Sequence, residues 1–150
     1  MTFQNLAALF DTKSTDLGAT PWQTVSKADV QVFAELTGDH QWIHLDEAKA
    51  KTDSPYGQPI VHGALILALA PVFVGQLLNI NNIRHVVNAG MDRVRFRQPV
   101  PVGSRIRGAA RLNEVENFSG NALATVNLTI EIEGQRRPAC SCEQRMIIHA

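Results

Sequence analysis

The strongest structural signal in the sequence is a two-residue alternation between Ala122 and Glu133. Its even-numbered positions are apolar, whereas the odd-numbered positions from Thr125 onward are Thr, Asn or Glu. This period is typical of a β-strand with one buried and one solvent-facing side. Similar alternation around residues 94–96, 106–112 and 140–148 predicts several long antiparallel strands. Such a sheet must cover its apolar face.

The natural cover for that face is the apolar segment from about residue 63 to residue 78. No charged residue occurs between Asp53 and Arg84, and every residue from Ala64 to Ala70 is apolar. We therefore expect a helix that is buried on nearly all sides. Pro71 should kink this helix or mark its last regular turns. The run from Ile60 to Leu78, which includes this segment, is near the lower limit of roughly 17–25 residues for a membrane span, so a buried helix is the favoured interpretation and no membrane partner is expected.

Size and charge fit an ordinary globular chain. The 150 residues predict a single domain over residues 1–150. Fourteen Lys and Arg balance fourteen Asp and Glu, which gives no long-range attraction to nucleic acid. Cys140 and Cys142 resemble neither a disulfide framework nor a zinc ligand set, so we interpret them as core residues in a reducing compartment. With no evident signal peptide, we expect a cytoplasmic protein.

The candidate chemistry lies in the stretch that precedes the apolar segment. Ser26 followed by Asp29 is close to a capping box and predicts the start of a helix, which Gly38 should end. On a continuous helix Asp39 and His44 would point about 140° apart, given 3.6 residues per turn. They can therefore converge only if the chain turns after Gly38.

A carboxylate and an imidazole aimed at one spot can hold a water molecule and move its protons, which is general acid–base chemistry. No nearby Ser or Cys suggests a covalent route. Spacing alone leaves a plainer alternative open. In that alternative Asp39 belongs to a helix-end turn and His44 packs in a loop.

His62 and Gly63 stand where the apolar helix should begin. A helix N-terminus offers free backbone N–H groups and a positive partial charge, and glycine lets a ligand approach the backbone closely. Such an end would stabilise an oxyanion. The alternatives are that Gly63 serves packing and that His62 bonds the local backbone.

The stretch from Thr37 to Asp46, followed by Pro59 to Gly63, resembles the signature of the (R)-specific enoyl-CoA hydratases, the MaoC-like dehydratases. The later stretches from Asn88 to Phe96 and from Pro99 to Gly103 resemble the continuation seen in the NodN-like branch. The resemblance covers roughly residues 20 to 148. It implies an α+β hot-dog fold, in which a curved antiparallel sheet wraps around one long central helix.

The resemblance also implies a reaction, the reversible hydration of trans-2-enoyl thioesters to (3R)-hydroxyacyl thioesters. Asp39 and His44 would be the catalytic pair, and the Gly63 amide would supply the oxyanion hole. The substrate would be an acyl-CoA or acyl-carrier-protein thioester. Coenzyme A would be part of the substrate, and no separate cofactor or metal is expected. Family members usually form homodimers, often by joining their sheets edge to edge, and an uncovered edge strand favours the same expectation.

Two departures from the better-known hydratases concern the rest of the pocket. Gln41 and Trp42 occupy the place of an Asn-Pro pair, and the central helix lacks a serine near Pro71. Gln41, Trp42, His62 and Asn88 are candidate substrate-binding residues. Trp42 could instead pack in the structure or at a dimer contact, which is the favoured interpretation for a lone Trp.

Two other functions fit a hot-dog fold: an acyl-CoA thioesterase and a non-catalytic acyl-thioester binding protein. The pairing of Asp39 with His44 favours hydration over both. Arginines recur along the predicted strands and could form a solvated sheet face or contact coenzyme A phosphates. The solvated face is favoured for most of them. These arginines are Arg93, Arg95, Arg97, Arg105, Arg107 and Arg111.

Overall fold

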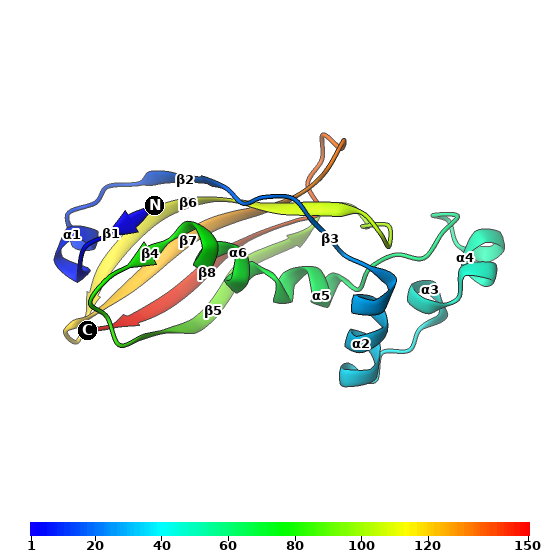
Figure 1. Ribbon diagram of the computed structural model, residues 1–150, viewed down its shortest axis with the longest axis horizontal. Helices are drawn as coiled ribbons and strands as arrows, with labels where there is room; N and C mark the ends of the chain where they lie inside the picture. The colour runs from blue at the N-terminus through cyan, green and yellow to red at the C-terminus, as the bar shows by residue number, and fades with distance from the viewer.

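A computed structural model describes residues 1–150. Its strands are β1 (Thr2–Phe3), β2 (Thr15–Ala19), β3 (Gln23–Thr24), β4 (Asn79–Ile80), β5 (His85–Phe96), β6 (Arg105–Phe118), β7 (Asn121–Ile132) and β8 (Cys140–His149). Its helices are α1 (Leu6–Phe10), α2 (Lys27–Thr37), α3 (Trp42–Leu45), α4 (Glu47–Asp53), α5 (Gly63–Ala68) and α6 (Ala70–Leu77). The main sheet has the order β2-β6-β7-β8-β5, with β3 paired to β6, and it curves around α5 and α6 (Figure 1). This is the hot-dog fold that the sequence predicts.

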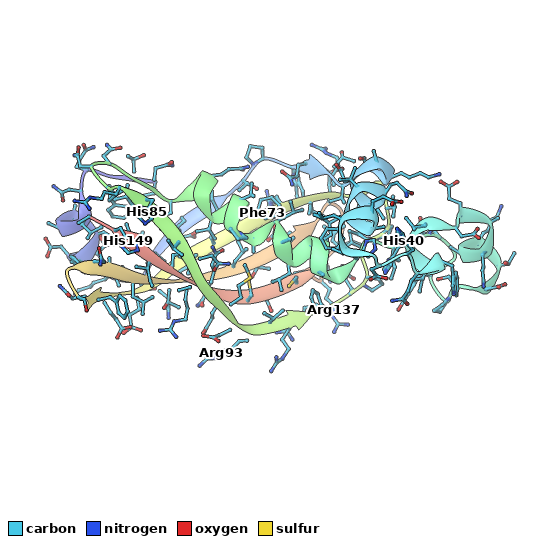
Figure 2. All side chains as sticks on the ribbon, turned by 90° about the horizontal axis from the view of Figure 1, so that it is seen from below. His40, Phe73, His85, Arg93, Arg137 and His149 are labelled. Atoms are coloured by element: carbon cyan, nitrogen blue, oxygen red, sulfur yellow. The ribbon has the colours of Figure 1, made fainter.

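The alternation that predicted the sheet is confirmed in its central strands. Even-numbered residues of β7 are buried and odd-numbered residues are half-buried throughout the strand. Cys140, Cys142, Met146 and Ile148 line the same inner face from β8. Beneath the middle of the sheet lies the fully buried Phe73 of α6 (Figure 2). A Cβ added to Gly108 of β6 would lie only 2.5 Å from Phe73 Cβ, so glycine permits this close approach.

The central helix agrees with one of the two predictions for Pro71 and differs from the predicted burial. It is broken at Leu69 into α5 and α6, and Pro71 lies in the first turn of α6, so the helix is interrupted near Pro71 and does not end there. Proline is tolerated there because the first amides of a helix have no internal partner. The expectation of burial on nearly all sides is wrong for a single chain, since Ala64 and Ala68 are exposed and Val72 is 51% exposed. The sheet covers one face of the helix, and the other remains free.

Strand β5 forms one edge of the sheet and pairs only with β8. Its register shifts twice, between Asn88 and Gly90 and between Asp92 and Arg95. Most of its residues are exposed, including Val86 and Val87. The alternation expected around residues 94–96 is therefore interrupted: Val94 is half-buried and Phe96 is 56% exposed.

Helices α2, α3 and α4 lie together at one end of the molecule, and both chain termini lie at the opposite end (Figure 1). The chain passes from this helical end into α5 through residues 54–62, which contain no helix or long strand. The catalytic candidates therefore lie where the helical end meets the start of the central helix. None of the helices is long and apolar enough to cross a membrane.

Candidate active site

The turn that brings the catalytic candidates together follows α2. Ser26 caps this helix, and the reciprocal Ser26–Asp29 capping box predicted from the sequence is present. Gly38 ends the helix in a left-handed conformation, with φ of 78°, and its N–H donates to the Ala34 carbonyl. This conformation favours glycine. The chain then reverses through residues 39–41 into α3, which carries His44. The predicted break between Asp39 and His44 is confirmed.

Three polar side chains converge at this turn: those of Asp39, His44 and His62. One side-chain donor or acceptor atom from each lies within 4.8 Å of the others. The two imidazole rings are stacked with their centroids 3.8 Å apart. Residues from the end of α2, from α3 and from the start of α5 therefore meet at one point.

A backbone carbonyl fixes the orientation of the His44 ring. His44 Nδ1 lies 2.7 Å from the Ile60 carbonyl oxygen. A carbonyl oxygen can only accept a hydrogen bond, so the proton of the neutral ring is on Nδ1. Nε2 then carries the free lone pair. His44 is thereby prepared to accept a hydrogen bond from a water molecule at the site.

The ring of His62 stacks on that of His44 from the protein interior, and His62 is only 2% exposed. Its Nε2 donates to the Asp39 backbone carbonyl at 3.0 Å and lies 4.0 Å from the Asp39 carboxylate. The Phe33 ring packs against it, with 5.1 Å between centroids. Its Nδ1 is buried without a hydrogen-bond partner. His62 thus ties the backbone of Asp39 to the start of α5 and supports the His44 ring from below.

The surroundings of Asp39 keep its carboxyl ionised. Partial burial acts to raise the pKa of Asp39, but hydrogen bonds from the Gln41 backbone and side chain lower it, and the nearby His44 and His62 imidazoles lower it further. The net result is a pKa below the ordinary value. An ionised carboxylate at this position suits removal of a proton from water.

Gly63 is the first residue of α5, directly after His62. Its N–H lies in the first helical turn, where amides have no partner within the helix. The residue is exposed, and a Cβ added here would lie 3.2 Å from the Phe96 ring. It lines a hollow of about 350 Å³ together with Phe96 and Arg97. An amide without a partner in the helix, directly after His62 of the polar cluster and at the wall of this hollow, is available to an oxygen atom of a ligand.

The remaining sequence candidates have different positions. Gln41 is exposed, and its N–H donates to Asp39 Oδ1 at 3.4 Å. Trp42 is half-buried in α3 beneath Lys49, whose Nζ lies 4.8 Å from the ring centroid. Asn88 is not brought to the catalytic pair within one chain. It lies on β5 opposite Met146 and lines a different cavity.

Sequence reasoning missed the Ile60 carbonyl and the supporting role of His62, which it named only as a candidate substrate contact or a group that bonds local backbone. Neither carries a spacing signal, because each acts across more than fifteen residues of chain through a tertiary contact. The Pro59–Gly63 motif was the available signal, but its pattern suggested a substrate contact for His62 and not a support for Asp39.

Asp39, His44 and His62 are also the residues that could hold a metal ion. A zinc ion needs ligand atoms at about 2.0–2.2 Å, so donors spread over as much as 4.8 Å would have to draw together. One nitrogen of each imidazole is engaged by a backbone carbonyl, which leaves the other ring nitrogen for a ligand.

The six arginines have different surroundings. Arg95 and Arg111 are exposed and donate to the Val94 carbonyl and to Ser14 Oγ, respectively. Arg93, Arg105 and Arg107 pair with glutamates on neighbouring strands, at 2.7–2.8 Å. These three form a solvated face of the sheet, as favoured from the sequence. Arg97 instead lines the hollow that contains Gly63.

Comparisons with known proteins agree with this geometry. The sequence profile described as MaoC like domain matches residues 10–133. The chain is 41% identical over 143 residues to a protein named 3-hydroxyacyl-thioester dehydratase Z from Mycobacterium tuberculosis, covering 95% of this chain and 94% of that protein. It is 40% identical over 136 residues to Nodulation protein N from Rhizobium leguminosarum, covering 89% and 84% respectively.

Among solved structures, the (R)-hydratase from A. caviae involved in PHA biosynthesis superposes with a TM-score of 0.74. The match covers 91% of this chain and 96% of that chain at 24% sequence identity. At this identity the likeness establishes a shared fold.

Proposed function

Because this chain belongs to the MaoC-like domain family of hot-dog hydratases and dehydratases, we propose that it is an (R)-specific enoyl-CoA hydratase. It would catalyse the reversible hydration of trans-2-enoyl thioesters to (3R)-hydroxyacyl thioesters. The observation that carries the proposal is the convergence of Asp39 and His44 beside the free amide of Gly63. The name of the mycobacterial relative, a 3-hydroxyacyl-thioester dehydratase, describes the same reaction in reverse.

In the proposed mechanism, a water molecule lies between the Asp39 carboxylate and His44 Nε2. Asp39 takes a proton from this water as the oxygen attacks the β-carbon. The electrons of the double bond move toward the thioester carbonyl and form an enolate. The protonated Asp39 then returns this proton to the α-carbon and is ionised again. The other proton of the water stays on the new β-hydroxyl group, so both protons are accounted for in the hydroxyacyl product.

The enolate oxygen gains negative charge during the reaction, and the Gly63 amide would stabilise it. Fixed dipoles are most effective at the atom where charge develops. A side chain at position 63 would meet the Phe96 ring and narrow the approach to this amide. Arg97, in the same hollow, would be available to a phosphate of the carrier portion of an acyl-CoA or acyl-carrier-protein thioester.

The test is hydration of crotonyl-CoA, followed as loss of the enoyl absorbance. Asp39→Asn should lower kcat by about 10²–10⁴-fold, the usual contribution of general acid–base catalysis. Glu35→Gln is a matched control, because Glu35 is an exposed carboxylate on α2 that pairs with His40 at 3.5 Å. Full activity in the Asp39 variant would remove the role assigned to this residue.

The same samples separate the alternatives. A thioesterase would release free thiol, which a thiol-trapping reagent detects. A binding protein would retain acyl-CoA without turnover at any chain length, and His44→Ala would have no effect. The Asp39–His44 pair favours hydration over both.

We further propose a homodimer and a cytoplasmic location. The free edge of β5 and the exposed apolar side of α5 and α6 leave a surface that a second copy could cover. Light scattering at micromolar concentration tests this proposal, and a monomeric mass would contradict it. The two unpaired cysteines suit a reducing compartment.

A further inference from the structure

A cavity of about 200 Å³ lies between α6 and the strands β5 and β8, away from the catalytic pair. Its walls are mainly apolar and include Pro71, Val74 and Met146. Two amide side chains, Gln144 and Asn88, interrupt the apolar lining. Gln144 is 1% exposed, and its Oε1 has no hydrogen-bond partner.

Gln144 occupies an inward position of β8, between the buried Cys142 and Met146. The neighbouring inward positions of the strand are apolar, so the alternation predicts an apolar residue at position 144. A buried polar atom without a partner costs roughly 1–3 kcal/mol. This cost is recovered when a donor enters the cavity and bonds the oxygen.

Asn88 supplies the complementary group. Its Oδ1 accepts a hydrogen bond from the Gly90 N–H at 3.3 Å, which leaves the side-chain NH₂ group as a donor. The cavity therefore contains an acceptor on Gln144 and a donor on Asn88. A hydroxyl group, which both donates and accepts, matches this pair.

The cavity lies further along the central helix than Gly63. Gly63 begins α5, whereas Pro71, Val74 and Gly75 line the cavity from α6, which follows α5 after the break at Leu69. The hollow at Gly63 and this cavity also share strand β5, through Phe96 in the first and Asn88 in the second. A groove of about 520 Å³ beside α2 contains Leu65 and Leu69, which lie on the opposite side of the helix.

The distance from Gly63 sets the length of a chain that would reach the cavity. Pro71 and Gly75 follow Gly63 by eight and twelve residues, which is roughly 12–18 Å at 1.5 Å per residue. An extended chain advances roughly 1.2 Å per bond, so this span corresponds to roughly ten to fifteen bonds.

We propose that this cavity binds the far end of the acyl group and that Gln144 and Asn88 select a medium-length chain bearing a terminal hydroxyl. The proposal rests on the proposed hydratase function and names its substrate class. Gln144 acts on selectivity and takes no part in the proton transfers.

The experiment compares kcat/KM for trans-2-dodecenoyl-CoA and its ω-hydroxylated form, with crotonyl-CoA as a reference that is too short to reach the cavity. The intact protein should favour the hydroxylated substrate by about 10-fold, the value of one or two hydrogen bonds. Gln144→Met, which keeps a similar shape, should bring the ratio to one or below. Asn88→Leu, on the exposed edge strand, should lower the same ratio and provides a second variant.

Asn127→Leu is the matched control, because Asn127 Oδ1 is also buried without a partner but lies by Arg93 and Ser141, outside this cavity. Its ratio should equal that of the intact protein. A ratio near one in the intact protein, or one that neither cavity variant lowers, would overturn the subsite while crotonyl-CoA turnover upholds the hydratase. Absence of turnover with all three substrates would overturn the hydratase and the subsite together.

Discussion

The sheet interior and the turn after α2 have opposite effects on the ionisation of an acidic side chain. In the sheet, burial raises the pKa of Cys142 to about 11, and the neighbouring Cys140 acts in the same direction. At the turn, burial also acts to raise the pKa of Asp39, but the Gln41 amide and the two imidazoles outweigh it. In the paired strands the backbone amides donate hydrogen bonds to the neighbouring strands. At the turn, backbone amides remain available to donate to a carboxylate. The interior of a regular sheet therefore disfavours the ionised form of a side chain, whereas an irregular turn can stabilise that form.

The largest expected effect of this difference concerns the cysteines. With a pKa of about 11 for Cys142, its thiolate fraction near pH 8 should be roughly two-hundred-fold below that of an ordinary cysteine. A thiol reagent should therefore label the folded protein far more slowly than the protein in urea. Equal labelling rates in the folded and unfolded protein would show that the sheet does not disfavour the thiolate form of Cys142.

Next in size is removal of the support beneath the catalytic pair. His62→Leu eliminates the hydrogen bond to the Asp39 carbonyl and the stacking on His44, so kcat for crotonyl-CoA should fall by about 10²-fold through misplacement of the pair. His40→Gln is the control, because His40 is exposed on the same turn (Figure 2). Circular dichroism should show the fold retained in both. Unchanged kcat in the His62 variant would make its contacts incidental to catalysis.

A third change acts on the sheet and not on the chemistry. Gly108→Ala places a methyl group against Phe73 and should lower the free energy of unfolding by about 1–3 kcal/mol through overpacking. Gly75→Ala, where an added Cβ meets nothing within 4 Å, should leave that free energy unchanged or slightly higher. Urea unfolding measures both. Equal effects at the two sites would contradict the close packing of Phe73.

The smallest effect is the response of Asp39 to mild acid. Its folded pKa lies below the ordinary value, so its contribution to stability is present above the unfolded pKa of about 3.9 and is lost only as the pH falls through the lower folded value. Lowering the pH from about 7 to about 5 should therefore leave this carboxylate ionised. An NMR titration of the Asp39 carboxyl carbon checks this directly. A midpoint above the ordinary value would reverse the assigned electrostatics.

The same two regions differ in how well the sequence predicts them. Successive residues of β7 face opposite sides of the sheet, so the alternation of apolar and polar residues was enough to identify the buried face. The capping box at Ser26 and the end of α2 at Gly38 were predicted for the same reason, because each involves residues only a few positions apart. The sequence of strand β2 shows no alternation, and the strand forms by pairing with β6. The local sequence therefore did not predict it.

The site was predicted in part. The turn at Gly38 followed from local pattern and allowed Asp39 and His44 to converge, but their pairing was expected from the family resemblance. The placement of His62 and Asn88 depended on tertiary packing. His62 proved to be buried under the pair, and Asn88 proved to lie near the far end of the central helix. An interruption of the central helix near Pro71 was predicted, but its position at Leu69 was not, since Pro71 is compatible with either a kink or a helix start.

That break has a consequence for motion. It leaves α5 with six residues and only Ile66 fully buried, whereas α6 has eight residues and buries Ala70, Phe73, Val74 and Leu77. A helix this short has little stability of its own and depends on its packing. Amide hydrogen exchange should therefore be faster in α5 than in α6, through local opening that leaves the sheet intact. The amide proposed to hold the enolate would thus belong to one of the least protected segments of the interior, so a bound thioester should slow exchange there first.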